Sequence, residues 1–449
     1  MAQLPPSTDE QPTNGDDRKR VGRILNAARD EAVRNPKLGI EFLRRYEEYV
    51  KGMAQDERDP AGPGGPISLV HRSSRLIVLG RVAAVTEQLP RVLPVIEARG
   101  GMIEQVEDDP RIGVSLVSVS GLSGEALYAV VSELVRQPPG ALPPLSVGFD
   151  DVTYEAAITF KPIRPQGSSG EAVRTKLSSR RPEGTGHGKG VTIGVIDGAY
   201  EPDTAPPRTD GWFDRVIGPA DGRPPINQQD PTLLDPGAGH GTFVTGIIAS
   251  IAPDATIRQY RATDSWGFGS AWRLKDQILQ AVADGCQVIN ISLGFDDPDL
   301  IGSPAISAAL HQVPSSVVVV GAAGNGGTNT PMLPASHKAA IAVGGVAESL
   351  IPLGWSNRGP WVDCSALANP VVSTYVVDPA DPLADPNPFA IWAGTSFAAP
   401  KVAGKLAVLV GRGMTPVQAM DALRSLAGQG LPSPDFGYLL DLPDEWPPA

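Results

Sequence analysis

The chain has 449 residues and a formal net charge of −12, which argues against nucleic acid or an acidic membrane surface as its main partner. Its 50 glycines and 45 prolines are spread among apolar segments, as is typical of a loop-rich globular protein. No apolar run approaches the roughly 18 residues of a membrane span, and residues 1–20 lack the apolar core of a secretory signal. We therefore expect a cytoplasmic protein with neither a membrane nor a nucleic-acid partner.

Residues 1–66 combine a polar tail that we expect to be disordered, a helical segment and a linker. Apolar residues follow helical spacing across 21–50, with an interruption at Asn35-Pro36. This segment could dock a regulatory protein, but packing against a neighbouring domain is the commoner use of such an amphipathic helix. Residues 53–66 are rich in Asp, Gly, Pro and Glu, which is typical of a linker.

Strand and helix patterns alternate over residues 67–162. The predicted order is strand, helix, two strands, helix and strand, at 75–79, 82–99, 102–106, 112–119, 123–136 and 145–149. This order is typical of a ferredoxin-like α+β domain, a fold that hosts many functions. Residues 163–189 follow as a second linker that is rich in basic residues, Ser and Gly.

Residues 190–449 carry continuous apolar strands separated by helical patterns. Strands are expected at 191–196, 288–291, 317–320 and 340–343, and helices at 242–250, 271–283 and 304–311. Such a succession indicates an α/β domain with a mostly parallel sheet flanked by helices. The two cysteines, Cys286 and Cys364, lie in apolar segments, so we expect buried free thiols and no disulfide.

The segment Gly394-Thr395-Ser396-Phe397-Ala398-Ala399-Pro400 places a serine at the start of an apolar helix pattern. Backbone N–H groups are free at a helix N-terminus and can face developing negative charge. A serine hydroxyl is a weak nucleophile unless a neighbouring base removes its proton. The segment therefore predicts a nucleophile only if the chain also supplies a base and a group that orients it.

Two further motifs supply such groups. Asp197 ends the apolar strand at 191–196, and His240 begins a helix pattern between two glycines. Alone, the first could be a turn residue and the second a surface or core histidine. Taken in the order Asp197, His240, Ser396, they match a triad in which Ser396 attacks, His240 is the base and Asp197 orients the imidazole.

Asn325 follows a buried strand on the Gly-rich turn Gly321-Ala322-Ala323-Gly324-Asn325-Gly326. Its side-chain amide could donate a hydrogen bond to an oxyanion, although an asparagine beside glycine is also a common turn residue.

At these four points residues 190–440 resemble the subtilisin-like serine peptidases. The motif 288–294 resembles the strand with which that family pairs the substrate backbone, so the resemblance implies substrate contacts at Ser292, Leu293 and Gly294. It also implies a subtilisin-like α/β fold, the triad Asp197, His240 and Ser396, and Asn325 as oxyanion donor. From the resemblance, losing Asn325 is expected to lower turnover about a hundred- to a thousand-fold, the cost found in this family.

The chain departs from the family pattern at several points. Gly198 follows Asp197 where a small hydroxyl residue is usual, Phe243 stands where a histidine is common, and 205–237 is an insertion. These changes bear on substrate preference and loop packing. Many relatives bind calcium, so the resemblance leaves a calcium ion open, but no ligand set is identified here, and the turn Asp296-Asp297-Pro298-Asp299 is interpreted as solvated. We expect no cofactor and assign no metal-binding residue.

Members of the family often carry a β-α-β-β-α-β prodomain, and the resemblance gives the segment 74–150 that role. In such proteins the prodomain's tail lies in the catalytic cleft as a product-like inhibitor. The hypothesis is a zymogen in which residues 151–189 thread the cleft and are cut by Ser396. The N-terminal domain is then the chain's own inhibitor.

The leading hypothesis is a serine endopeptidase that acts on a protein or peptide substrate through an acyl-enzyme. A catalytically silent protein that binds extended peptides along 292–294 is the alternative, and an esterase or amidase is a third reading. The intact triad and Asn325 weigh against the silent protein.

Overall fold

The computed structural model describes residues 67–70, 75–136, 144–155, 173–175, 185–198, 210–218, 239–263, 267–376, 388–425 and 432–442. The helical segment expected at 21–50, the linker at 53–66 and most of the 205–237 insertion lie outside these ranges. None of the helices within them is long and apolar enough to cross a bilayer.

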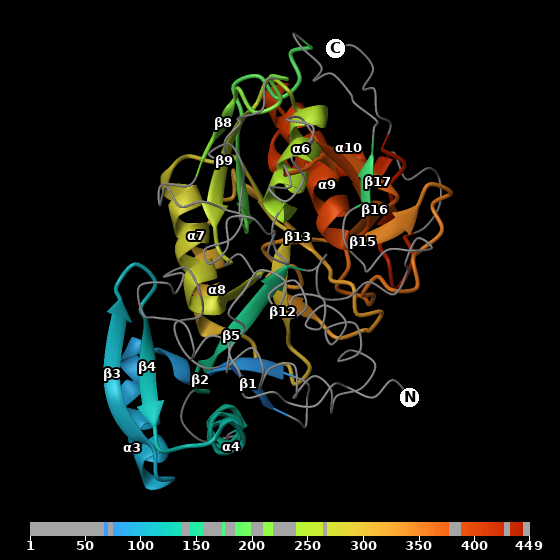
Figure 1. Ribbon diagram of the computed structural model, residues 1–449. Helices are drawn as coiled ribbons and strands as arrows, with labels where there is room; N and C mark the ends of the chain where they lie inside the picture. The colour runs from blue at the N-terminus through green and yellow to red at the C-terminus, as the bar shows by residue number, and fades with distance from the viewer. Residues whose placement is uncertain are drawn as a thin grey trace, which may run out of the picture.

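The N-terminal strands form an antiparallel sheet at one end of the molecule (Figure 1). Its strands pair in the order β5-β2-β4-β3, and β1 pairs with β2. The elements are β1 (Ile67–Val70), β2 (Arg75–Val85), the 3-10 turn η1 (Thr86–Gln88), α3 (Leu89–Ala98), β3 (Met102–Asp109), β4 (Val114–Ser120), α4 (Gly124–Val135) and β5 (Val147–Glu155). From β2 onward, the strands and helices follow the order β-α-β-β-α-β.

The helix expected from residue 82 starts later than the sequence predicts. β2 continues through Val85, and α3 begins at Leu89. Val82 and Ala84 pack with residues of α3 and α4, whereas Ala83 packs on the opposite face of the sheet. This alternation is that of a strand buried on both faces. Pro90 lies in the first turn of α3, where its missing N–H removes no helical hydrogen bond.

The two faces of the N-terminal sheet contact different parts of the chain. On one face, Val117 and Phe149 pack against α3 and α4. On the other, Leu116 packs with Trp272 and Ala305, which belong to two helices of the C-terminal part. Apolar burial therefore fixes this sheet both to its own helices and to the rest of the protein.

The C-terminal part is built on a parallel sheet with strand order β19-β16-β15-β13-β11-β7-β9-β8, as the α/β prediction requires. The strands are β7 (Thr192–Asp197), β8 (Val216–Ile217), β9 (Thr256–Arg261), β11 (Val288–Ile291), β13 (Val318–Ala322), β15 (Ile341–Ala347), β16 (Cys364–Asn369) and β19 (Tyr438–Leu439). The helices are α6 (His240–Ile251), α7 (Ala271–Ala283), α8 (Pro304–His311), α9 (Thr395–Gly411) and α10 (Pro416–Ser425).

Helices cover both faces of the parallel sheet (Figure 1). Val318 and Val320 of β13 point to the cluster that includes α6 and α9, while Val319 points to the cluster that includes α7 and α8. Burial on both faces explains why β13 carries no polar side chain from Val318 to Ala322. Cys286 and Cys364 are buried free thiols, as predicted.

A small antiparallel sheet joins β17 (Val371–Thr374), β18 (Phe389–Trp392) and β6 (Val173–Thr175). β6 lies within the segment 163–189 that the sequence predicts to be a linker. Part of that linker is therefore a strand that pairs with β18.

β5 extends the N-terminal sheet to strands of the C-terminal part. Its last residues pair in antiparallel fashion with β10 (Phe268–Ser270) and β12 (Leu293–Asp296), and β12 pairs with β14 (Met332–Leu333). In Figure 1, β5 runs from the N-terminal strands toward the centre of the molecule. The end of β5 thus lies between two strands of the C-terminal part.

The acidic turn at 296–299, interpreted from the sequence as solvated, instead holds the N-terminal part. Arg75 forms a buried ion pair with Asp297 at 2.7 Å and a bidentate pair with Asp151 of β5 at 2.6 and 2.9 Å. Tyr128 donates to Asp299, and Tyr154 donates to Asp296 at 2.8 Å. The expectation was wrong because partners from a distant segment cover these carboxylates.

Burial raises the pKa of Asp296 to about 6, and the negative charge of Asp297 acts in the same direction. The hydrogen bond from Tyr154 opposes this rise without cancelling it.

Candidate active site

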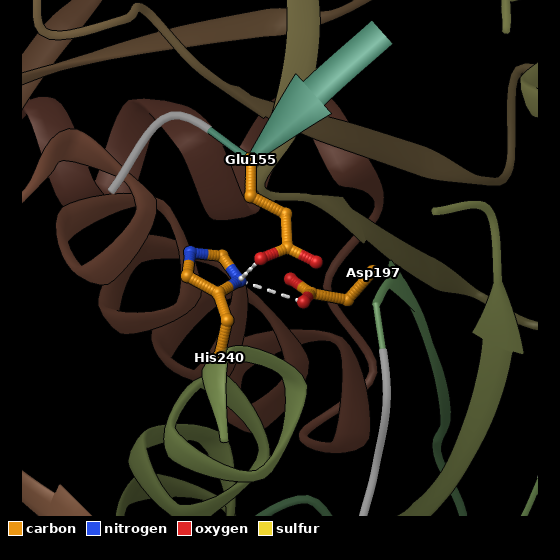
Figure 2. Close-up of side chains that lie close together, drawn as sticks. All are labelled: Glu155, Asp197 and His240. Carbon is orange, nitrogen blue, oxygen red and sulfur yellow. Dashed lines mark hydrogen bonds and ion pairs between the residues drawn. The ribbon is translucent and has the colours of Figure 1, made fainter. Parts of the chain in front are cut away.

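Asp197 lies at the carboxyl end of β7, where ligands gather in parallel α/β sheets. Its Oδ1 atom accepts hydrogen bonds from the Gly198 N–H at 2.7 Å and from His240 Nδ1 at 2.7 Å (Figure 2). A carboxylate can only accept, so this contact assigns the proton to Nδ1 and leaves Nε2 as the basic ring nitrogen. Asp197 and His240 therefore form a buried acid–imidazole pair.

His240 is the first residue of α6 and is fully buried. Gly239 precedes it with a φ of 83°, and a Cβ there would lie 2.5 Å from the Tyr375 ring, so the position requires glycine. The imidazole packs edge-on against Trp392 at 5.7 Å between ring centroids. Figure 2 shows its second nitrogen facing away from the carboxylates.

Ser396 is the second residue of α9, and Pro400 follows it four positions later in the same helix. Pro400 has no N–H, so the helical hydrogen bond to the Ser396 carbonyl is missing. The Ser292 hydroxyl donates to that carbonyl at 2.9 Å, and the Ser396 hydroxyl donates to the Ser292 carbonyl at 3.0 Å. Two reciprocal bonds thus fix the start of α9 to the segment before β12.

The starts of α6 and α9 lie side by side. The ring of Phe397, the residue after Ser396, is centred 5.5 Å from the imidazole of His240. In this arrangement the single hydroxyl proton of Ser396 is directed at the Ser292 carbonyl. The hydroxyl must rotate away from that carbonyl before it can donate its proton to an imidazole.

Asn325 lies on the Gly-rich turn after β13 and is buried. Its Oδ1 atom accepts a hydrogen bond from the Thr395 N–H at 2.9 Å, one residue before Ser396. The neighbouring Gly324 N–H donates to the Thr395 hydroxyl at 3.0 Å. Because the amide oxygen is engaged at the start of α9, the Nδ2 group is the donor that can serve an oxyanion.

The expected substrate strand is already paired with the chain's own β5. Leu293 pairs with Glu155 and Gly294 with Tyr154, while the Glu155 N–H donates to the Gly267 carbonyl at 3.1 Å. The expected substrate-binding residues Leu293 and Gly294 therefore contact a peptide strand in this structure. Ser292, the third of them, is hydrogen-bonded to Ser396.

Glu155 is a site residue that the sequence does not reveal. Its side chain is fully buried, Oε1 accepts from the Thr263 hydroxyl at 2.6 Å, and Oε2 lies 3.8 Å from His240 Nδ1 (Figure 2). A Cβ at Gly198 would overlap the Oε1 atom. Only the pairing of β5 with strands more than 100 residues away brings this carboxylate to the Asp197–His240 pair, and no local motif signals it.

Glu155, Asp197 and His240 place one ligand atom each within 4.8 Å of one another. Within the described part of the chain, they form the one group of three or more such side chains close enough to bind a metal ion. The Nδ1 atom, however, donates its proton to Asp197, and a protonated nitrogen has no lone pair for a metal. The geometry thus suits proton transfer better than coordination.

Phe243, one of the departures from the family pattern, is a core residue. It is fully buried, and its ring lies 4.5 Å from Phe397 and 5.6 Å from Trp392 between centroids. It thus packs against Phe397, the residue after Ser396, and against Trp392, whose ring contacts His240. The departure therefore concerns packing beneath the site.

The comparisons with known proteins agree with this geometry. Residues 188–438 match the model of the Subtilase family. The chain is 36% identical over 211 residues to a thermophilic serine proteinase of Bacillus sp. (strain AK1), covering 45% of this chain and 49% of that protein. It is 28% identical over 284 residues to thermitase of Thermoactinomyces vulgaris, covering 60% of this chain and 92% of thermitase.

The alignment with the first of these relatives spans about half of that relative's length. In structure, the chain is similar to fervidolysin from Fervidobacterium pennivorans, a keratinolytic enzyme related to subtilisin. The TM-score is 0.55 at 20% identity, covering 80% of this chain and 59% of fervidolysin, which supports the fold. Because the family model matches more than half of the sequence, the chain belongs to the subtilase family.

Proposed function

We propose that this chain is a serine endopeptidase in which Ser396 attacks the peptide carbonyl, His240 is the base and Asp197 orients it. The observation that carries the proposal is the 2.7 Å hydrogen bond from His240 Nδ1 to Asp197, next to the start of the helix that bears Ser396. That bond fixes the tautomer in which Nε2 can take a proton. Membership of the subtilase family supports the same assignment.

The reaction starts when Ser396 turns its hydroxyl from the Ser292 carbonyl to His240 Nε2. The oxygen then bonds to the substrate carbonyl carbon while Nε2 takes the proton, and Asp197 stabilises the imidazolium. The carbonyl oxygen becomes an oxyanion that Asn325 Nδ2 and the backbone N–H of Ser396 stabilise. His240 returns the proton to the leaving amine, and water hydrolyses the acyl-enzyme by the same steps.

We further propose that the N-terminal part is a ferredoxin-like prodomain that inhibits the enzyme. The pairing of β5 between β10 and β12 supports this, since a bound β5 competes with any substrate that pairs there. A chain that kept this register for one position beyond Glu155 would lie opposite Ser292, whose carbonyl accepts a hydrogen bond from the Ser396 hydroxyl. The first cut is therefore expected after residue 156; residues 156–162 lie outside the described ranges.

Mass spectrometry of the full chain and of its Ser396→Ala variant tests both proposals. Self-cleavage predicts fragments separated at residues 156 and 157 in the wild type and a full-length mass in the variant. Ser365→Ala is the control, because Ser365 is buried in the same domain and bonded to Phe436 O. Full-length masses for both the wild type and Ser396→Ala would reject self-cleavage.

Labelling with a fluorophosphonate probe separates a peptidase from a silent peptide-binding protein. An activated Ser396 should react, slowly while β5 occupies the site, and both Ser396→Ala and His240→Ala should abolish the reaction. A chain that never labels at Ser396 would reject the peptidase and favour the silent protein. Because side chains supply every proton transfer, we propose that no cofactor is needed, and a chelator should leave the labelling rate unchanged.

A further inference from the structure

We propose that the space bounded by Gly198, Thr263 and the Asp197–His240 pair is a binding site for a glutamate side chain of the substrate. This site, called here the glutamate subsite, takes the residue immediately before the one that acylates Ser396. The inference rests on the proposed peptidase function and adds a substrate class to it: peptides with glutamate at that position. Glu155 occupies the subsite in the structure and serves as its model ligand.

The register of β5 defines which substrate position the subsite reads. Tyr154 pairs with Gly294 and Glu155 with Leu293, so one step forward along β5 is one step back along the partner strand. The next partner is Ser292, whose carbonyl accepts the Ser396 hydroxyl. In a peptide bound in this register, the residue opposite Ser292 is the one whose carbonyl Ser396 attacks. Glu155 then occupies the position of the residue immediately before it.

Three features of the subsite suit a carboxylate on a two-carbon side chain. The Thr263 hydroxyl donates to Oε1 at 2.6 Å, a short hydrogen bond of the kind that charged acceptors form. The missing side chain at Gly198 provides room for Oε1, because a Cβ there would overlap that atom. Oε2 lies 3.8 Å from His240 Nδ1, close enough to stabilise the imidazolium that forms during attack.

Charge and length set the expected order of preference. Aspartate is one methylene shorter and does not reach Thr263, while glutamine accepts the hydrogen bond without the charge. The negative charge of Asp197 repels the carboxylate of the substrate glutamate. This repulsion offsets part of the attraction between that carboxylate and the His240 imidazolium. The remaining charge-assisted bond predicts glutamate over alanine by about 10-fold or more in kcat/KM, with glutamine between them.

The test uses the full chain and four peptide amides, Thr-Tyr-X-Ala joined to a fluorogenic amine, with X as Glu, Gln, Asp or Ala. Occupation of the site by β5 lowers the rate for all four peptides equally, so the ratios of kcat/KM report the subsite alone. A Glu-to-Ala ratio of about 10 or more is expected. Equal rates would overturn the inference and leave the peptidase function intact, whereas no cleavage of any peptide together with no fluorophosphonate labelling of Ser396 would count against the function.

Two variants test whether the named residues cause the preference. In Gly198→Ser the new side chain overlaps the position of the glutamate carboxylate, so the Glu-to-Ala ratio should fall to about one. Thr263→Val keeps the shape of the side chain but removes the donor, and should lower the ratio several-fold. Wild-type ratios in both variants would contradict the assignment.

A second readout needs no catalysis. In the Ser396→Ala chain, backbone amide exchange of β10 and β12 reports how firmly β5 is bound. Glu155→Ala should accelerate this exchange about 10-fold or more, and Glu155→Gln should restore part of the protection. Tyr154→Phe is the matched control, because it removes one hydrogen bond to Asp296 outside the subsite. If Glu155→Ala exchanges no faster than this control, the subsite contributes no specific binding and the inference fails.

Discussion

Replacing Arg75 by methionine should destabilise the protein far more than removing an ordinary surface cation. The side chains of Arg75 and Asp151 are fully buried, that of Asp297 is 7% exposed, and the three N–O distances are 2.6, 2.7 and 2.9 Å. Methionine keeps the length of the side chain but leaves two buried carboxylates without their cation. Breaking a buried pair in this way costs about 3–5 kcal/mol.

The assay is denaturant unfolding of the full chain in the Ser396→Ala background, which prevents self-cleavage during the measurement. Arg99→Met is the matched control, because Arg99 pairs with Glu133 at 2.5 Å while both side chains are about half exposed, at 51% and 50%. That exposed pair should contribute less than about 1 kcal/mol. A second variant, Arg75→Met with Asp151→Asn and Asp297→Asn, should recover part of the loss. If Arg75→Met and Arg99→Met differ by less than about 1 kcal/mol, the buried network does not hold the two parts together.

Three further predictions concern the interface and the support of the site. The pKa of Asp296 is raised to about 6 in the folded protein, so the folded state binds the extra proton; the contribution of Asp296 to the free energy of unfolding should fall as the pH rises from about 4 to 6 and then level off. Asp296→Asn should flatten that part of a plot of unfolding free energy against pH, and an unchanged slope would contradict the assignment. Phe243→Ala should cost about 3–5 kcal/mol in denaturant unfolding, because it leaves a cavity against Phe397; a loss below about 1 kcal/mol would show that the ring is not part of the core. Ser292→Ala leaves the Ser396 carbonyl without its donor and should cost about 1–3 kcal/mol, together with slower fluorophosphonate labelling of Ser396; wild-type stability and labelling would refute the supporting role of that hydroxyl.

The parallel sheet could be predicted because its central strands are buried on both faces and are therefore largely apolar. Val318, Val319 and Val320 show this in three successive residues that point to alternating cores. The same reasoning misplaced the start of α3, since Val82 and Val85 fit a helical period as well as a strand. Pro90 was the better signal, because proline is favoured in the first turn of a helix. Whether the N-terminal part is a ferredoxin-like prodomain stays a prediction.

In the candidate site, too, residues in local motifs could be predicted from the sequence, whereas residues brought in by long-range pairing could not. Asp197 and His240 lie in short local motifs, and the structure brings them to 2.7 Å. The roles of Ser396 and Asn325 stay predictions. Ser396 lies in the first turn of α9, and Asn325 accepts a hydrogen bond from Thr395 at the start of that helix. Glu155 and the interface role of Asp297 could not be predicted, because each depends on pairing between segments more than 100 residues apart. The sequence carries no periodic pattern for such contacts.

The position of β5 between β10 and β12 has a consequence for handling the protein. A strand edge without a partner is a template for any extended chain, including a second copy of the same molecule. Here β5 pairs with both edges, so it shields them from association with other molecules. A truncation that begins after residue 155 removes this cover, and such a product is expected to aggregate during expression unless a peptide is supplied to take the vacated place.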